Sequence, residues 1–473
     1  MKFIFLSLFI CLSTLAQADV FVVNDTGDVD QCDQSICTLR GAINDATRTL
    51  GTDTINFDIP ADAVNQNYVS GGSGNNAFFY WIIQPTQELP VVLGITIDGT
   101  SAGASPFGNP SIVIDGSLAG TGTNQDPMDG LTMRGNSTIK GLSFIYWDEA
   151  GLRIASGSTN LVTNSWFGLN LPYGLAAAPN KVGIQYDSTG NNNELKGSLG
   201  ISGNVISGNS QYGLATYFES SGLLISGNMI GTDPKGEIAV PNDNIGVFLK
   251  GRNQQLGTGQ LFSQKNLISG NLIGIQTSSY PVENFSNMLI TNNIIGLNLN
   301  TDAEIPNRDG LYVQRGRGFS ITENIIAGND SYGISVTNEP KDVTISNNRI
   351  GHTSSGGAFS NNTAIRSSGG AERVKIGPDN IIAKNRYGVR VTGFSTGQTH
   401  IFLNQIYDND FLGIDLGDLG TNSNDLGDLD AGPNRLQNYP DIQAAQYDTS
   451  GNRIQISFSV DSQIGASDYP MTI

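Results

Sequence analysis

The stretch that decides the fold is residues 379–393, "DNIIAKNRYGVRVTG". The same phrase occurs as "GNVISGNSQYGLAT" at 203–216 and as "ENIIAGNDSYGISVT" at 323–337. Each copy holds an asparagine, an aliphatic pair, a second asparagine, and a glycine followed by an aliphatic residue. A phrase that returns in this way indicates repeated structural units that stack on one another.

The repeat has two kinds of unit. Aligned on the first asparagine, the copies fall at Asn204, Asn228, Asn266, Asn293, Asn324, Asn348, Asn380 and Asn404. Short units carry the second asparagine five residues on, whereas the others have a glycine directly after the aliphatic pair, followed by a polar excursion. The excursions recur at one phase of the repeat, so we expect them to project from one side of the stack.

Each unit is long enough for two or three short strands with turns between them. The segment "YGISV" (332–336) alternates side chains with period two, and glycine or asparagine stands wherever the alternation breaks. Short strands joined in one direction and stacked at a fixed interval predict a right-handed parallel β-helix solenoid over residues 61–440, within an all-β chain. We expect the turn asparagines to adopt the left-handed conformation and to form hydrogen-bonded ladders, so their repetition reflects geometry and not a repeated ligand site.

The N-terminus has the features of an export signal. Residues 1–18 contain Lys2, an apolar run from Phe3 to Leu15, and a small-x-small cleavage site ending at Ala18. No later segment has the roughly 18 to 20 apolar residues that a membrane span needs. The mature chain is therefore expected to be secreted or held at the cell surface.

Removing the signal leaves Cys32 and Cys37 as the two remaining cysteines, and in an exported chain they predict a local disulfide. The formal net charge of −18 argues against nucleic acid and anionic membranes as partners. It would also repel acidic glycans unless calcium bridged the two. The glycines mark turns and form no phosphate-binding loop, so no organic cofactor is predicted. The oligomeric state stays open.

Residues 19–60 are predicted to cap the first coil. In "CTLRGAINDATRTLGTDTINF" (37–57), Leu39, Ala42, Ile43 and Ala46 fall at helical spacing, and "TINF" follows as a strand. These residues resemble the CSLREA module of exported bacterial β-helix proteins, with Thr38 in place of serine and Gly41 in place of glutamate. The repeats resemble those of the pectin-lyase-like superfamily. The first resemblance implies a surface protein without a common reaction, and the second implies polysaccharide lyases, hydrolases or epimerases.

An acidic, glycine-rich segment at 415–434 follows the last coil. We expect Asp425, Asp428 and Asp430, with Asn424 or Asn434, to bind one calcium ion, because flexible loops with hard oxygen ligands suit that ion. The alternative is a solvated acidic loop. Beyond Pro440, "NRIQISFSV" alternates apolar and polar residues, so 441–473 is predicted to be the start of a C-terminal β-sandwich of a longer chain.

A catalytic residue should break the repeat, because a reaction needs one site while a stack needs many similar units. The basic residues that do so, and are candidates for a lyase-type base, are Arg315, Arg317, Lys375 and Arg386. The histidines, His352 and His400, lie in different units. The regular repeats favour a non-catalytic rod that binds glycan or matrix, or acts as an adhesin, and the alternative is a polysaccharide lyase, hydrolase or epimerase.

Overall fold

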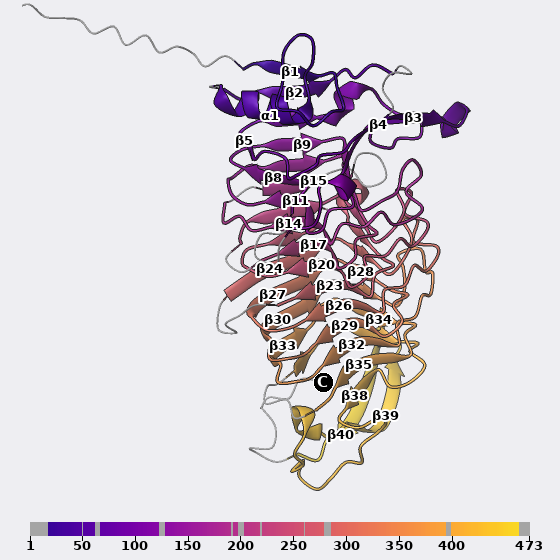
Figure 1. The fold of residues 1–473 in the computed structure, drawn as a ribbon. Helices are drawn as coiled ribbons and strands as arrows, with labels where there is room; N and C mark the ends of the chain where they lie inside the picture. The colour runs from indigo at the N-terminus through magenta and orange to yellow at the C-terminus, as the bar shows by residue number, and fades with distance from the viewer. Residues whose placement is uncertain are drawn as a thin grey trace, which may run out of the picture.

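The computed structural model describes residues 18–49, 51–61, 67–122, 128–190, 193–196, 203–217, 220–259, 261–278, 285–393 and 399–462. The predicted signal at 1–18 lies outside these ranges except for Ala18. The described strands stack into a column of coils, from the N-terminal helix at one end to strands β39 and β40 at the other (Figure 1). Strands of successive coils pair in parallel, so the predicted parallel β-helix is confirmed.

Each coil gives one strand to each of three sheets, in chain order. Sheet 1 holds, among the described residues, 13 strands in the order of the chain. They are β1 (Val20–Val23), β2 (Thr54–Phe57), β6 (Thr96–Asp98), β9 (Thr138–Lys140), β12 (Leu161–Thr163), β15 (Asn193–Lys196), β18 (Leu223–Ser226), β21 (Gln255–Leu256), β24 (Phe285–Thr291), β27 (Arg317–Thr322), β30 (Lys341–Ser346), β33 (Glu372–Ile376) and β36 (Thr399–Ile401).

Sheet 2 is built from shorter strands and begins with an antiparallel hairpin of β3 and β4. Its strands are β3 (Tyr68–Gly71), β4 (Phe78–Ile83), β7 (Ile112–Asp115), β10 (Leu142–Ile145), β13 (Trp166–Phe167), β16 (Val205–Ile206), β19 (Met229–Ile230), β22 (Leu267–Ile268), β25 (Ile294–Ile295), β28 (Ile325–Ile326), β31 (Arg349–Ile350), β34 (Ile381–Ala383) and β37 (Gln405–Tyr407).

Sheet 3 closes each coil. Its strands are β5 (Val92–Leu93), β8 (Leu131–Arg134), β11 (Ala150–Ile154), β14 (Val182–Tyr186), β17 (Tyr212–Thr216), β20 (Ile245–Leu249), β23 (Ile273–Thr277), β26 (Asp309–Val313), β29 (Tyr332–Val336), β32 (Thr363–Ser367), β35 (Tyr387–Val391) and β38 (Ile414–Leu416). Short 3-10 turns lie at Gly74–Asn76, Gly99–Ala102, Gly116–Leu118, Phe262–Gln264 and Pro433–Leu436.

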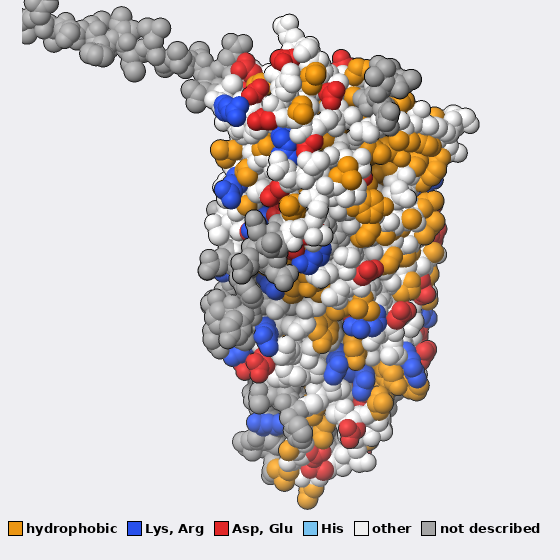
Figure 2. All heavy atoms as spheres, in the orientation of Figure 1, with side chains coloured by type: hydrophobic (Ala, Val, Ile, Leu, Met, Phe, Trp, Pro, Cys, Tyr) orange, Lys and Arg blue, Asp and Glu red, His pale blue; other side chains and the backbone are white. Residues whose placement is uncertain are grey.

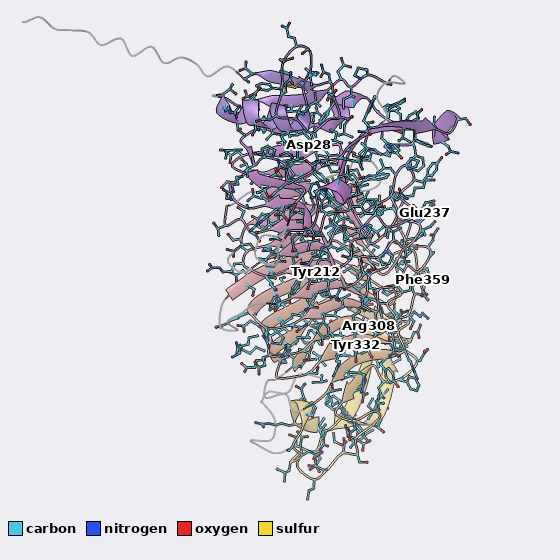
Figure 3. The ribbon with its side chains drawn as sticks, viewed as in Figure 1. Asp28, Tyr212, Glu237, Arg308, Tyr332 and Phe359 are labelled. Carbon is cyan, nitrogen blue, oxygen red and sulfur yellow. A yellow bond between two sulfur atoms is a disulfide. The ribbon has the colours of Figure 1, made fainter. Side chains whose placement is uncertain are left out.

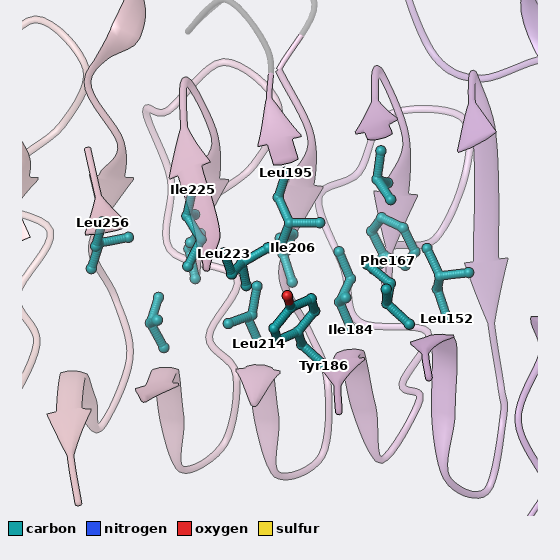
Figure 4. Packing of buried hydrophobic residues seen from close by; sticks show 14 of the residues in the cluster. Leu152, Phe167, Ile184, Tyr186, Leu195, Ile206, Leu214, Leu223, Ile225 and Leu256 are labelled. Atoms are coloured by element: carbon teal, nitrogen blue, oxygen red, sulfur yellow. The ribbon is translucent and has the colours of Figure 1, made fainter. Parts of the chain in front are cut away.

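The core is a column of aliphatic side chains inside the three sheets. Ile290, Ile321, Ile345 and Ile376 occupy the same position in successive strands of sheet 1, and each is fully buried. Figure 4 shows how side chains from all three sheets meet in the interior, with Leu195 from sheet 1, Ile206 from sheet 2 and Leu214 from sheet 3 close together. Each aliphatic shelf packs on the next, so burial is continuous along the stack.

Two buried asparagine ladders run along the corners of the coil. At the corner between sheets 1 and 2, the side-chain nitrogen of Asn324 donates to the side-chain oxygen of Asn348 (3.0 Å), and Asn348 donates in the same way to Asn380 (3.1 Å). The same contact joins all eight aligned residues from Asn204 to Asn404. The predicted ladder is confirmed.

The second ladder lies at the corner between sheets 2 and 3. It runs through Asn180, Asn209, Asn242, Asn271, Asn307, Asn329, Asn361, Asn385 and Asn409. The ladder asparagines do not take the left-handed conformation, so that prediction was wrong. At the corner between sheets 1 and 2, the left-handed conformation is taken by the residue before the ladder asparagine, as at Glu323 (φ 59°) and Asn347 (φ 57°). This residue turns the chain and leaves the asparagine side chain pointing inward.

The N-terminal cap packs one helix on the first coils. Helix α1 (Leu39–Arg48) buries Leu39, Ala42 and Ile43, and the Thr38 side chain accepts a hydrogen bond from the Gly41 backbone nitrogen. A Cβ at Gly41 would come within 2.2 Å of the Gln31 backbone oxygen, so this close approach requires glycine. Cys32 and Cys37 form a disulfide in the loop before α1.

The polar excursions cover the outer face of sheet 2. Each folds back as a small antiparallel bridge, such as Leu169 with Ala177 and Leu297 with Glu304. Between the loops and the sheet lies a second apolar cluster that includes Trp166, and it is separate from the solenoid core. The loops line the right-hand side of the molecule in Figure 1. They therefore project from one side, as the phase of the repeat predicts.

Beyond the last coil, strands β39 (Asp441–Asp448) and β40 (Arg453–Ser459) form an antiparallel hairpin. The sequence predicts the strand at β40, but its apolar side chains are exposed and not half-buried as expected. Ile454, Ile456 and Phe458 are 65%, 51% and 44% exposed. Among the described residues, the hairpin pairs with no third strand, so one apolar face stays open.

The ladder generates a stability prediction. Asn324→Ala should lower the free energy of unfolding by about 3 kcal/mol, because it leaves the Asn293 backbone nitrogen without its buried acceptor and the Ile290 backbone oxygen without the Asn324 side-chain donor. Asn300 is exposed in an excursion, and Asn300→Ala should change that free energy by less than about 0.5 kcal/mol. Denaturant unfolding followed by circular dichroism measures both variants, and equal effects would contradict a structural role for the ladder.

Candidate functional site

The four basic residues singled out from the sequence do not form one site. Arg317 and Lys375 lie on sheet 1, in strands β27 and β33, while Arg315 lies in the turn that precedes β27. Arg386 lies at the corner that leads into β35 of sheet 3. Arg386 is therefore on another face than Arg317 and Lys375.

The outer face of sheet 1 is polar and internally paired. Asp342 accepts hydrogen bonds from Arg317 and from Arg373 (2.6 Å), and Lys341 lies 3.5 Å from Glu372. The bonds from Arg373 and Arg317 lower the pKa of Asp342 to about 2. The charges of these five side chains are therefore neutralised locally.

The outer face of sheet 3 carries aromatic rings that are half-buried or buried. Tyr212 and Phe248 lie with their rings tilted and their centroids 5.4 Å apart, and Tyr217 and Tyr312 join them in an apolar cluster outside the core. The Lys250 Nζ lies 4.5 Å from the Phe248 centroid and 5.5 Å from that of Tyr217. Burial lowers the pKa of Lys250. We call these four rings the aromatic cluster.

Toward the C-terminal end, the same face pairs rings with arginines. The Arg366 guanidinium carbon lies 5.2 Å from the Tyr332 centroid, and Arg390 lies 5.3 Å from that of Tyr387. Arg386 is 5.5 Å from Tyr387. Figure 3 shows Tyr212, Arg308 and Tyr332 in line along this face, and Figure 2 shows Lys and Arg side chains gathered over its C-terminal half.

A cavity of about 590 Å³ lies at this end, between strands β29, β32 and β35 and the segment 417–436. Tyr332, Arg366 and Arg390 form the sheet wall, and Asp418 and Leu436 belong to the opposite wall. Asp415 in β38 is buried next to Arg390 in the same outward column, and its carboxylate accepts a hydrogen bond from Arg390 at 3.2 Å. We call this space the arginine cavity. Its size is that of a typical small-ligand site.

The N-terminal end of the face holds a cluster of charges around Arg153. Arg153 donates to Asp187 (2.7 Å) and lies 3.6 Å from Asp129, and Lys181 pairs with Glu149 at 2.5 Å. The Asp129 side chain is 4% exposed. Burial raises the pKa of this carboxyl to about 6, although the Ala150 backbone nitrogen and Arg153 act in the opposite direction.

The acidic segment after the last coil holds the predicted calcium ligands. Asp428 accepts from the Asn438 backbone nitrogen (2.8 Å), and Asp425 accepts from that of Leu429 (3.1 Å). Burial and the neighbouring Asp425 and Asp428 carboxylates raise the pKa of Asp430. Within the described ranges, no three His, Cys, Asp or Glu side chains are arranged to hold a metal ion. Calcium binding stays a prediction.

The residues of the arginine cavity were missed as a site by sequence reasoning, although a signal was present. A tyrosine precedes the glycine in all three quoted phrases, at Tyr212, Tyr332 and Tyr387. The parallel register places these tyrosines in one outward column. Arg366 and Arg390 follow in the neighbouring outward column as direct partners. The glycine predicts a turn, and that prediction says nothing of the outward tyrosine before it.

Comparisons with known proteins agree with this architecture. Residues 201–350 match the family model "Right handed beta helix region", and residues 298–415 match "Periplasmic copper-binding protein (NosD)". The protein is a right-handed parallel β-helix. This β-helix matches no curated protein sequence. The CSLREA resemblance of its cap stays a prediction.

Several solved structures are similar to the β-helix. The mannuronan C-5 epimerase AlgE6 A-module of Azotobacter vinelandii is 14% identical over 81% of this chain and 94% of its own, with a TM-score of 0.42. PfbA, a surface adhesin of Streptococcus pneumoniae, is 11% identical over 90% and 94%, with a TM-score of 0.39. An alginate lyase of a Paenibacillus species is 14% identical over 83% and 97%, with a TM-score of 0.28. No conclusion about activity rests on these likenesses.

In the described part of the β-helix, no helix is long and apolar enough to cross a bilayer.

The raised pKa of Asp129 generates a pH prediction. The unfolded carboxyl ionises near 3.8 and the folded one near 6, so the folded state loses stability as pH rises from about 4 to 6. Asp129→Asn should therefore raise the free energy of unfolding at pH 7.5 by about 2 to 3 kcal/mol, and by little at pH 4. Asp342→Asn is the matched control and should destabilise at pH 7.5, because that carboxyl has a lowered pKa. Thermal unfolding across this pH range measures both, and a destabilised Asp129→Asn at pH 7.5 would contradict the assignment.

The calcium prediction has a direct test. Millimolar calcium should raise the melting temperature of the mature chain and protect residues 415–434 from proteolysis, because a bound cation would relieve repulsion among Asp425, Asp428 and Asp430. Magnesium at the same concentration is the control for ionic strength. If calcium changes neither the melting temperature nor the cleavage pattern, the segment is a solvated acidic loop.

Proposed function

We propose that the protein is exported and acts as a rod that binds a glycan along the outer face of sheet 3, without changing the glycan chemically. The observation that carries this proposal is the aromatic cluster, a group of ring side chains on the outside of the solenoid. Export is supported by the signal-like residues 1–18 and by the match to a family described as periplasmic.

The three outer faces differ in what they offer to a partner. Sheet 1 presents polar side chains and ion pairs such as Arg373 with Asp342. Sheet 2 is covered by the excursions, which bury its outward apolar residues. Sheet 3 presents half-buried rings beside polar groups. The half-buried tyrosines of this face offer apolar surface that a partner can cover.

The chemistry of this face suits sugars. A sugar ring has an apolar face, which stacks on an aromatic ring, and hydroxyl groups around its edge, which need hydrogen-bond partners. Gln185 and Gln276 lie in the same outward column as Phe248 and Tyr312, and Lys250 stands over the rings. Coils repeat at roughly 4.8 Å, so the contacts are spaced along the rod axis as a linear polymer would need.

The second candidate function is an enzyme that cleaves the bound glycan, and one observation favours it. Asp129, Glu149 and Asp187 lie around Arg153 and Lys181 at the N-terminal end of the same face. Hydrolysis needs a carboxylic acid that keeps its proton near neutral pH and a second, ionised carboxylate. The raised pKa of Asp129 meets the first requirement.

Retention of the mature chain on a panel of neutral and acidic polysaccharides tests the proposal. Tyr212→Ala and Tyr312→Ala should each weaken binding of the retained polymer by about tenfold, because each removes one stacking surface of roughly 1 kcal/mol or more. Tyr173→Ala is the control, since Tyr173 lies in an excursion on the sheet 2 side and should leave binding unchanged.

New reducing ends and the absorbance of unsaturated products are followed on the same panel. Binding without either product supports the rod. Turnover that is lost in Asp129→Asn would replace the rod with the second candidate function. Retention that is insensitive to Tyr212→Ala and Tyr312→Ala would contradict the assignment to sheet 3.

A further inference from the structure

We propose that the arginine cavity binds the carboxylate of an acidic sugar unit, held between Arg366 and Arg390, so that the rod prefers acidic over neutral glycans. This inference rests on the proposed function and names the chemical class of ligand that one end of the sheet 3 face selects. The arginine cavity lies at the C-terminal end of the sheet 3 face and is separate from the aromatic cluster.

The two arginines are held side by side by the strand register. Arg366 in β32 and Arg390 in β35 are direct partners in the parallel pair, so their backbones are one coil apart, roughly 4.8 Å. Like charges directly opposite each other on neighbouring strands repel. Asp415 neutralises Arg390, but it is a single carboxylate and serves only that partner. An anion in the cavity would relieve the remaining repulsion.

Most of the hydrogen-bonding capacity of the two guanidinium groups is unused. Arg366 donates from one terminal nitrogen to the Tyr332 hydroxyl (3.1 Å), and Arg390 donates from Nε to Asp415 (3.2 Å). Among the described residues, the other terminal N–H groups of both side chains have no acceptor. Guanidinium N–H groups form a planar fork that matches a carboxylate, which makes this anion the natural ligand.

The walls indicate a sugar and not a free ion. The volume of about 590 Å³ is far larger than a carboxylate needs, and Leu419, Pro433 and Leu436 make part of the outer wall apolar. Tyr332 offers a ring face beside the arginines. Asp418 and Asn422 line the same cavity, where they can accept from or donate to sugar hydroxyls. A sugar ring with one carboxylate and several hydroxyl groups can contact the arginines, the polar side chains and the apolar part of the cavity wall.

The strongly acidic chain makes such a site necessary for binding an acidic glycan. At a net charge of −18 the protein as a whole repels polyanions, and the arginine cavity is a local exception on the open face. It offers an alternative to the calcium bridge expected from the sequence. Binding through arginines should persist when calcium is removed by a chelator, and it should weaken as salt is raised.

The experiment compares three polymers. They are a carboxylated polysaccharide, the same polysaccharide with its carboxyl groups reduced to alcohols, and a neutral polysaccharide that carries sulfate groups. Binding to the mature chain is measured by calorimetry with chelator present. The wild-type protein should bind the carboxylated form about tenfold more tightly than the reduced form. Arg366→Gln should remove that preference and leave binding of the reduced form unchanged.

Two matched variants separate the cavity from charge and from folding. Arg366→Lys keeps the charge but loses the planar fork, so it should lose most of the preference. Arg373→Gln removes an arginine from the outer face of sheet 1 and should keep the preference. The melting temperature of each variant is measured first. A wild-type melting temperature for Arg366→Gln shows that lost preference is not misfolding.

The outcomes distinguish this inference from the proposed function. If carboxylated and reduced polymers bind equally, or if Arg366→Gln keeps the preference, the inference is wrong while glycan binding stands. Equal binding of the sulfated polymer would show a general anion site and would overturn carboxylate selection. If no polymer is retained in any form, both the proposed function and this inference fall.

Discussion

The structure depends on hydrogen bonding at the buried corners of each coil. A parallel β-helix turns its backbone sharply three times per coil, and the polar groups at those turns lie inside the stack. The asparagine ladders satisfy them. Each ladder amide donates to a backbone oxygen of the preceding coil and to the next ladder residue, as Asn324 does to Ile290 and Asn348. Since a half-satisfied buried network is costly, the ladder favours nearly identical coils.

This demand for identical coils determines where function can reside. The interior columns repeat with aliphatic residues, and the corners repeat with asparagine, so variation is left to the outward positions. On sheet 1, outward charged residues pair with one another, as Arg373 does with Asp342. On sheet 2, the excursions cover the outward residues. The face of sheet 3 keeps half-buried tyrosines such as Tyr212, and the guanidinium groups of Arg366 and Arg390 line a cavity on it. Its three regions, the charge cluster around Arg153, the aromatic cluster and the arginine cavity, follow one another along the rod.

Different elements cover the two ends of the stack, where no further coil packs on the apolar interior. At the N-terminus, α1 covers the apolar cross-section of the first coils, and Arg40, which pairs with Asp28 inside the cap, donates to the Glu88 backbone oxygen outside it. At the other end, segment 417–436 folds against the last strands of sheet 3 and closes the arginine cavity. The departure from regular coils is therefore what creates the arginine cavity.

The fold could be predicted from the sequence because its causes are local and repeated. Period-two strands, the aliphatic pairs and the aligned asparagines such as Asn324 each point to a stack of coils, and the cap helix follows from the spacing of Leu39, Ala42 and Ile43. The candidate site could not be predicted in the same way. Arg366 and Arg390 are 24 residues apart and meet through strand register, which also places Arg317 and Lys375 on another face. The sequence alone determined that the chain is a β-helix, since stacking needs only local pattern. Only the tertiary structure decided which outward residues share a surface, because that depends on the length of every turn between them.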